Sequence, residues 1–263
     1  MKARLRSAAP AGVLVVLLLA AWELYVQLGG VQSDVLPPPH AVASALWDER
    51  SLLAHNLAVT AEEVVLGLAL ATAAGFLLAL AVHLSPLLRR ALYPLAVGSQ
   101  AVPIPVIGVL LVFWWGFGLL PKLVVIALIC FFPVLVSTVD ALASVDPEQA
   151  KLMRTLDATR WQSLRFAELP AALPAALSGA RIALAVGVIG AFIAETTTPT
   201  SGAYPGLGRQ IISDVNFEVP RAYAGTVLLF LSAIACFHAL SVVQRRLAPW
   251  SIRERGEMSE SFS

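Results

Sequence analysis

Residues that could do chemistry are sparse in this sequence. It contains no CxxC, HExxH or other Cys/His cluster, so it predicts no metal site. It also lacks the phosphate-binding pattern GxxxxGK(S/T), so the chain is not expected to bind a nucleotide itself. The glycine pair in Gly206-Leu207-Gly208 is far more typical of a loop turn than of a nucleotide site. No converging set of catalytic groups is visible, and we expect no enzymatic activity.

The most informative stretch is polar and runs from Asp146 to Leu169, between two strongly apolar stretches. Leu152 and Leu156 lie one helical turn apart, as do Trp161 and Leu164. Apolar side chains flanked by arginines are typical of a helix that binds a groove on another protein. The alternative is a basic loop that lies on anionic lipid headgroups. The residues expected to contact a partner are Leu152, Arg154, Leu156, Asp157, Arg160, Trp161 and Leu164.

Composition identifies the setting of this polar stretch. Hydrophobic residues make up 58% of the chain, charged residues 13%, and the mean hydropathy is +0.79. Soluble domains carry about 25% charged residues, so this chain lacks the polar surface to face water on all sides. We therefore expect an all-α integral membrane protein. Cys130 and Cys236 lie in apolar runs and are expected to be buried thiols rather than a disulfide.

Runs of about 20 apolar residues predict six transmembrane helices. The first begins near Ser7; a cleaved signal peptide is the alternative, but no A-x-A site follows. Pro94, Pro103 and Pro105 fall in the third span and free backbone carbonyls, which favours a place facing the bundle interior or a pathway. The later spans are expected at about residues 64–83, 91–112, 120–142, 174–198 and 222–244.

The distribution of cations predicts the orientation of these spans. With a cytoplasmic N-terminus, 13 Lys and Arg residues lie inside, 4 lie outside, and Arg181 lies within a span. Both termini and the 146–169 segment are therefore expected to be cytoplasmic. We divide the chain into residues 1–55 (the first helix and an extracytoplasmic segment), 56–244 (the transmembrane core) and 245–263 (a cytoplasmic tail).

The polar segment resembles the EAA loop of ABC transporter permease subunits, whose pattern is E-A-A-x3-G-x9-I-x-L-P. Leu169-Pro170 matches the strict pattern, whereas Lys151-Leu152-Met153 stands at the EAA triplet, Asp157 at the glycine and Ala167 at the isoleucine. The sequence stretches around this loop match the family better. They are VDP from Val145, RTL, ATRWQ, LPAALPAALSGARIAL and GAFIAE. They resemble the branch that handles nitrate, sulfonates, taurine and thiamine pyrimidine precursors.

The resemblance implies a type I ABC importer permease bundle with a cytoplasmic coupling loop between the fourth and fifth helices. It implies two ABC ATPase subunits, which would bind the ATP, and a second permease copy, most simply in a homodimer. An extracytoplasmic substrate-binding protein would deliver solute to residues 29–56 and 198–220 of a chain embedded in the inner-membrane bilayer. No nucleic acid is implied. A thiamine pyrimidine precursor is the first expectation for the substrate; sulfonate or taurine, nitrate and riboflavin are the alternatives.

Two of the residues that depart from the family pattern, Asp157 and Lys151, each lead to a specific expectation. Asp157 tolerates the left-handed conformation that the family's glycine provides, so the turn is expected to be kept. Lys151 reverses the charge of the family's glutamate, so the surface that meets the ATPase is expected to differ.

Ionisable residues in or beside the spans are further candidates. Near span ends, snorkelling to the interface is the simplest explanation for them. Glu195 and Arg181 lie about 21 Å apart on one helix and cannot pair there, and we expect Glu195 to face the outer mouth of the pathway. The centres of the predicted spans lack Asp, Glu, Lys and Arg, which counts against an ion-coupled transporter. A membrane scaffold without transport activity would leave the polar segment unexplained.

Overall fold

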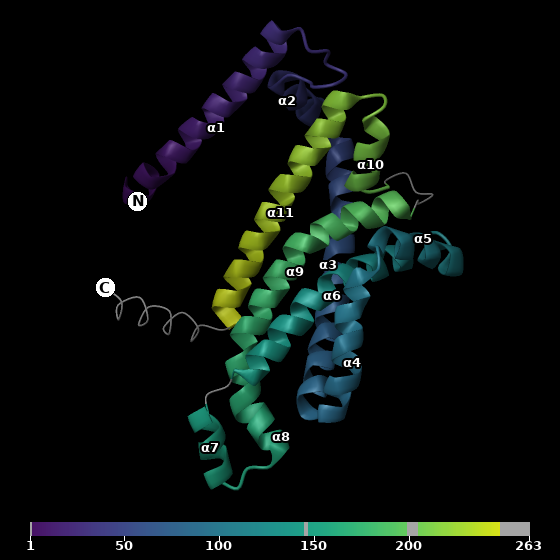
Figure 1. Ribbon diagram of the computed structural model, residues 1–263. Helices are drawn as coiled ribbons and strands as arrows, with labels where there is room; N and C mark the ends of the chain where they lie inside the picture. Colours follow the sequence, from purple (N-terminus) through teal and green to yellow (C-terminus); the bar gives the residue numbers. More distant parts are fainter. Residues whose placement is uncertain (1, 145–146, 199–204, 248–263) are drawn as a thin grey trace. The chain divides into compact units, whose positions relative to one another are not determined.

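The structure is a computed structural model that describes residues 2–144, 147–198 and 205–247, and every regular element in these residues is helical (Figure 1). The chain divides into two compact units that are described separately. One holds residues 1–59 and 202–230, and the other holds residues 60–201 and 231–263. The elements are α1 (Lys2–Gly29), α2 (Pro39–Asp48), α3 (Arg50–Leu84), α4 (Pro86–Gly98), η1 (Ser99–Ala101), α5 (Ile104–Trp115), α6 (Leu119–Ala143), α7 (Pro147–Thr155), α8 (Arg160–Ser163), η2 (Leu164–Glu168), α9 (Leu169–Thr197), α10 (Leu207–Asp214) and α11 (Val219–Leu247).

Five helical stretches of the described chain are long and apolar enough to cross a membrane. They lie in α1, α3, α6, the run from α8 to the end of α9, and α11. A sixth span exists if the bent pair of α4–η1 and α5 is counted as one. The predicted all-helical membrane fold is therefore confirmed.

The third predicted span, residues 91–112, is wrong as a single helix. α4 ends at Gly98, a short 3-10 turn follows, and α5 leaves at 99° to the preceding helix. The cause is Pro103, which lacks an N–H and forces Val102 before it into an extended conformation with φ −81° and ψ 126°. Residues 97–103 are exposed around this break.

The predicted second span, residues 64–83, is also too short. α3 begins at Arg50 and runs without interruption to Leu84, so it starts within the predicted extracytoplasmic segment that was expected to end at residue 55. As a result, polar residues of the first half of α3 become part of a long helix. Its length follows from the good helix-forming stretch between Leu52 and Glu63, which contains no proline or glycine.

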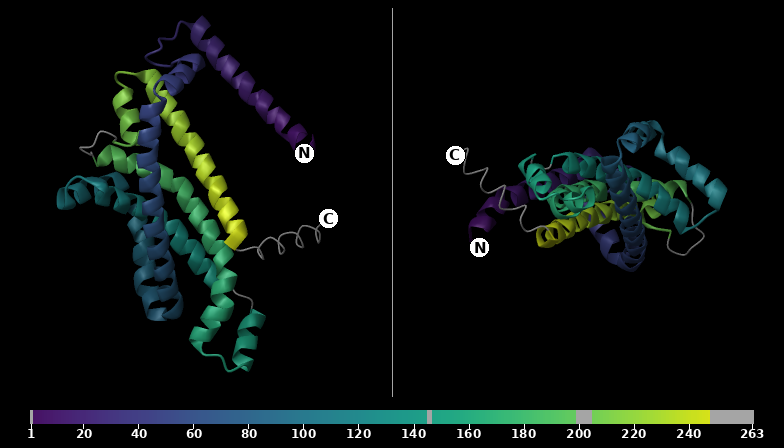
Figure 2. Two further views of the ribbon diagram at one scale, coloured as in Figure 1. Left: turned by 180° about the vertical axis from the view of Figure 1, so that it is seen from behind. Right: turned by 90° about the horizontal axis from the view of Figure 1, so that it is seen from below.

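The core of the larger unit is the contact between α6 and α9, which lie side by side in both views of Figure 2. Small residues on α9 allow this close approach. A Cβ atom added to Gly179 would overlap the Ser137 side chain of α6, and one added to Gly187 would lie 2.9 Å from Cys130 Sγ. The Cys130 thiol is buried and donates to the Ala183 carbonyl at 3.2 Å.

The smaller unit brings together the two segments that the sequence placed outside the membrane. The Asn56 amide at the start of α3 donates to Gln210 Oε1 of α10 at 2.5 Å. The Arg221 guanidinium at the start of α11 donates to both oxygens of Asp214, at 2.7 and 2.8 Å, and lies 3.7 Å from Glu49. These bonds tie the connection after α1 to the connection before α11.

Candidate functional site

The polar segment forms a helical hairpin at the start of α9. α7 and α8 lie beyond the end of α6 in Figure 1, which confirms the prediction that this segment is helical. Thr159 begins α8 through a capping box, in which its hydroxyl accepts from the Gln162 amide and its own amide donates to Gln162 Oε1 at 2.7 Å.

The turn between α7 and α8 is a Schellman motif with aspartate at its left-handed position. Asp157 has φ +48° and is the one non-glycine residue with positive φ in the described chain. The Ala158 amide donates to the Met153 carbonyl and the Asp157 amide donates to the Arg154 carbonyl, at 3.0 and 3.1 Å. Asp157 therefore adopts the left-handed conformation expected at the family's glycine position.

An apolar face remains open on this hairpin. Leu152, Leu156 and Trp161 are exposed, with more than half of their surface accessible. A groove of about 560 Å³ opens beside Leu152, and Met153 and Phe166 are also among the residues that line it. Exposed apolar patches of this kind are typical of protein interaction sites. The predicted residues Arg154 and Arg160 are exposed as well.

Leu164 does not belong to this face, although the sequence analysis placed it there. Its side chain is 0% exposed and packs with Ala141, Leu142 and Ala172, against Leu80 of α3. Leu164 stands where α8 continues into the π-helical turn of η2, in which the Leu169 amide reaches back five residues to the Leu164 carbonyl. Helical spacing alone does not tell which side of a hairpin meets the bundle, and Leu164 lies on the side that packs against α6 and α9.

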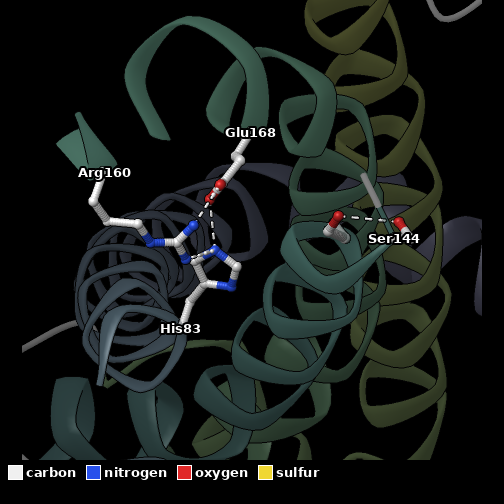
Figure 3. Close-up of polar contacts among 5 residues, drawn as sticks. His83, Ser144, Arg160 and Glu168 are labelled. Carbon is white, nitrogen blue, oxygen red and sulfur yellow. Dashed lines mark hydrogen bonds and ion pairs between the residues drawn. The ribbon is translucent and has the colours of Figure 1, made fainter. Parts of the chain in front are cut away.

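A polar clamp of His83, Arg160 and Glu168 holds the hairpin to the end of α3 (Figure 3). His83 Nε2 lies 2.6 Å from Glu168 Oε2, and Arg160 Nη1 donates to Glu168 Oε1 at 2.7 Å. Arg160 Nη2 lies 3.0 Å from the same histidine nitrogen. The clamp could not be predicted from the sequence, because its members are separated by up to 85 positions.

A second polar group is buried among α3, α6 and α9. Lys122 Nζ lies 2.6 Å from Glu63 Oε1, and the Thr60 hydroxyl donates to Glu195 Oε1 at 2.6 Å. Glu195 is 1% exposed and faces α3, so it does not line an open mouth as the sequence analysis expected. Lys122 lies inside α6, within the predicted span of residues 120–142. The long α3 accounts for the burial of Glu195 and Lys122, since it brings Thr60 opposite Glu195 and Glu63 opposite Lys122.

A smaller cavity of about 380 Å³ lies beside the break between α4 and α5. Phe132 of α6 and Ile189 of α9 are among its lining residues, and Gln100 contributes a side-chain amide. No charged side chain is found among the described residues that line it.

Comparison with known proteins identifies the family. The family described as the inner membrane component of binding-protein-dependent transport systems matches residues 71–253. The chain is 33% identical over 238 residues to the formylaminopyrimidine transport permease protein of Halalkalibacterium halodurans, covering 89% of this chain and 92% of that protein. It is 33% identical to the riboflavin transport system permease protein of Chloroflexus aurantiacus (90% and 88% covered) and 32% identical to the taurine transport system permease protein of Escherichia coli (89% and 86% covered).

Solved structures agree on the fold. A crystal structure of an amino acid ABC transporter with histidines superimposes with a TM-score of 0.62 at 17% identity, covering 76% of this chain and 96% of that chain. An inward-facing methionine ABC transporter gives a TM-score of 0.57 at 16% identity, covering 81% and 97%. The chain belongs to the family of inner membrane components of binding-protein-dependent transport systems, the ABC importer permeases.

Proposed function

We propose that this chain forms the membrane pathway of an ATP-driven importer, with α7, α8 and η2 as its coupling segment. The observation that carries the proposal is the open apolar face of Leu152, Leu156 and Trp161 on a hairpin that projects from the bundle. Two ATPase subunits, one for each permease copy, would bind this face and supply the ATP hydrolysis. The cation distribution supports a cytoplasmic position for the segment and for both termini.

A second copy of the chain completes the pathway in this proposal. The break between α4 and α5 leaves exposed, non-helical backbone within an apolar part of the chain. Such backbone is tolerated in a membrane only against protein or beside a water-filled cavity. In a homodimer whose pathway passes this break, the exposed backbone would lie against the second copy and beside the water-filled pathway.

The substrate in this proposal is a small neutral polar solute, with a thiamine pyrimidine precursor as the first candidate. One support is the similarity to a permease named for formylaminopyrimidine. The other is the cavity beside Gln100, whose described lining offers an amide and an aromatic ring but no cation to attract an anion. The similarities to riboflavin and taurine permeases keep those solutes as alternatives.

The test is ATP-dependent uptake by proteoliposomes that hold this permease with its ATPase and its binding protein. Formylaminopyrimidine, riboflavin and taurine are supplied separately at equal concentration. Uptake of formylaminopyrimidine that requires ATP and the binding protein supports the whole proposal. Uptake of taurine alone would overturn the substrate assignment, and no ATP-dependent uptake of any solute would contradict the role as an importer.

A further inference from the structure

The coupling segment is attached to the bundle at two places. Its end continues directly into α9, so any displacement of the hairpin reaches α9 through the chain. Its second attachment is to the last turns of α3, where Leu80 packs beside Leu164 and His83 contacts Glu168. Leu80 and His83 are three residues apart and therefore lie on one face of α3.

The polar part of the second attachment consists of His83, Glu168 and Arg160, and its hydrogen bonds fix the position of the Glu168 carboxylate. Both oxygens of Glu168 are used, one by His83 and one by Arg160, so the carboxylate is fixed from two sides. The side chains of His83 and Glu168 are 17% and 12% exposed, and bonds to a charged group are strengthened in such partly dry surroundings. One histidine nitrogen cannot donate to a carboxylate and accept from a guanidinium at once. Because Arg160 already donates to Glu168, the consistent arrangement has His83 Nε2–H donating to Glu168.

We propose that the His83–Glu168–Arg160 clamp transmits the movement of the coupling segment to α3. This inference rests on the proposed function. Without the clamp, a push on α7 and α8 would still displace α9, while the link from the hairpin to α3 would be reduced to the apolar packing around Leu80. His83, Glu168 and Arg160 are thus positioning residues for transport, and His83 and Glu168 lie outside the set expected to contact the ATPase.

The experiment compares ATP hydrolysis with uptake in the complete reconstituted importer. His83→Ala is expected to leave ATPase activity within about twofold of the unaltered complex and to lower the solute taken up per ATP by about tenfold, the size of a typical coupling between sites. His83→Gln keeps an N–H donor and is expected to restore most of the uptake. Asp140→Asn, which alters an exposed carboxylate near the end of α6, is the matched control and is expected to change neither quantity.

Other results would overturn the clamp. Equal losses of ATPase activity and uptake in His83→Ala would mean that the clamp only supports assembly, and unchanged uptake would mean that it transmits nothing. If His83→Ala folds poorly, the isosteric Glu168→Gln replaces it, with the same expected split between hydrolysis and uptake. Failure of the unaltered complex to transport would instead contradict the proposed function, so the two failures are distinguishable.

Discussion

Lys122 of α6 and Glu63 of α3 form an ion pair, 2.6 Å long, whose side chains are only 1% and 3% exposed. Removing one partner of a buried pair leaves an uncompensated charge and costs about 3–5 kcal/mol. We therefore expect Lys122→Met to lower the free energy of unfolding by about that amount, measured by denaturant titration in detergent micelles.

The double variant Lys122→Met with Glu63→Gln removes both charges and serves as the control. It is expected to recover most of the lost stability, because no uncompensated charge remains. A double variant as unstable as the single one would show that packing, not charge, holds α3 and α6 together here.

Charging the open face of the hairpin should abolish ATPase binding. Leu156→Asp and Trp161→Asp place a carboxylate in an apolar contact, and each is expected to reduce co-purification of the ATPase by at least about tenfold, as at interface hot spots. Phe217→Asp, on an exposed aromatic residue of the other unit, is the matched control. Normal yield of the ATPase with Trp161→Asp would rule out the docking role of this face.

The left-handed turn at Asp157 predicts opposite effects for two substitutions. Glycine is expected to protect the turn at least as well as aspartate, whereas a β-branched valine in this conformation costs about 1–2 kcal/mol. Hydrogen exchange of the amides of Asp157 and Ala158, which make the Schellman bonds, should slow or stay unchanged in Asp157→Gly and quicken in Asp157→Val. Equal exchange in both variants would show that the turn does not depend on this residue.

Charge substitutions at Ile189 distinguish a neutral substrate from an anionic one. Lysine and glutamate both impose a desolvation cost on a neutral solute that passes the cavity, so Ile189→Lys and Ile189→Glu should reduce uptake to a similar extent. An anionic solute would be hindered by the glutamate alone. Uptake that neither variant changes would remove this cavity from the pathway.

The orientation of the chain can be tested by single cysteines in a Cys130→Ala, Cys236→Ala background. Asn216→Cys should react with a membrane-impermeant maleimide in intact spheroplasts, while Gln149→Cys should react only after permeabilisation. Both residues are exposed, so accessibility on the protein itself is matched. The reverse labelling pattern would invert the topology.

Features that depend on near neighbours in the chain could be predicted from the sequence. Helical spacing placed Leu152 and Leu156 on one exposed face, and apolar length located α6 within one residue of its expected bounds of 120–142. The left-handed conformation of Asp157 was predictable because aspartate, as a residue type, tolerates positive φ better than most side chains.

Features that depend on distant contacts could not be predicted. Glu63 and Lys122 are 59 positions apart, and His83 and Glu168 are 85 apart, so no periodicity connects them. The break at Pro103 was missed because the total apolar length suited two straight spans. Leu164 was assigned to the wrong face because helical spacing does not show which side of the hairpin packs against α6 and α9.

The π-turn between Leu164 and Leu169 also has a geometric consequence for any displacement of α8 relative to α9. A π-turn holds one residue more than an α-turn, so a return to α-helical bonding between Leu164 and Leu169 would shift the register by one residue. One residue of register corresponds to about 1.5 Å of translation and about 100° of rotation. At this junction, a one-residue shift of α8 along the axis of α9 would therefore be accompanied by a rotation of α8 about that axis.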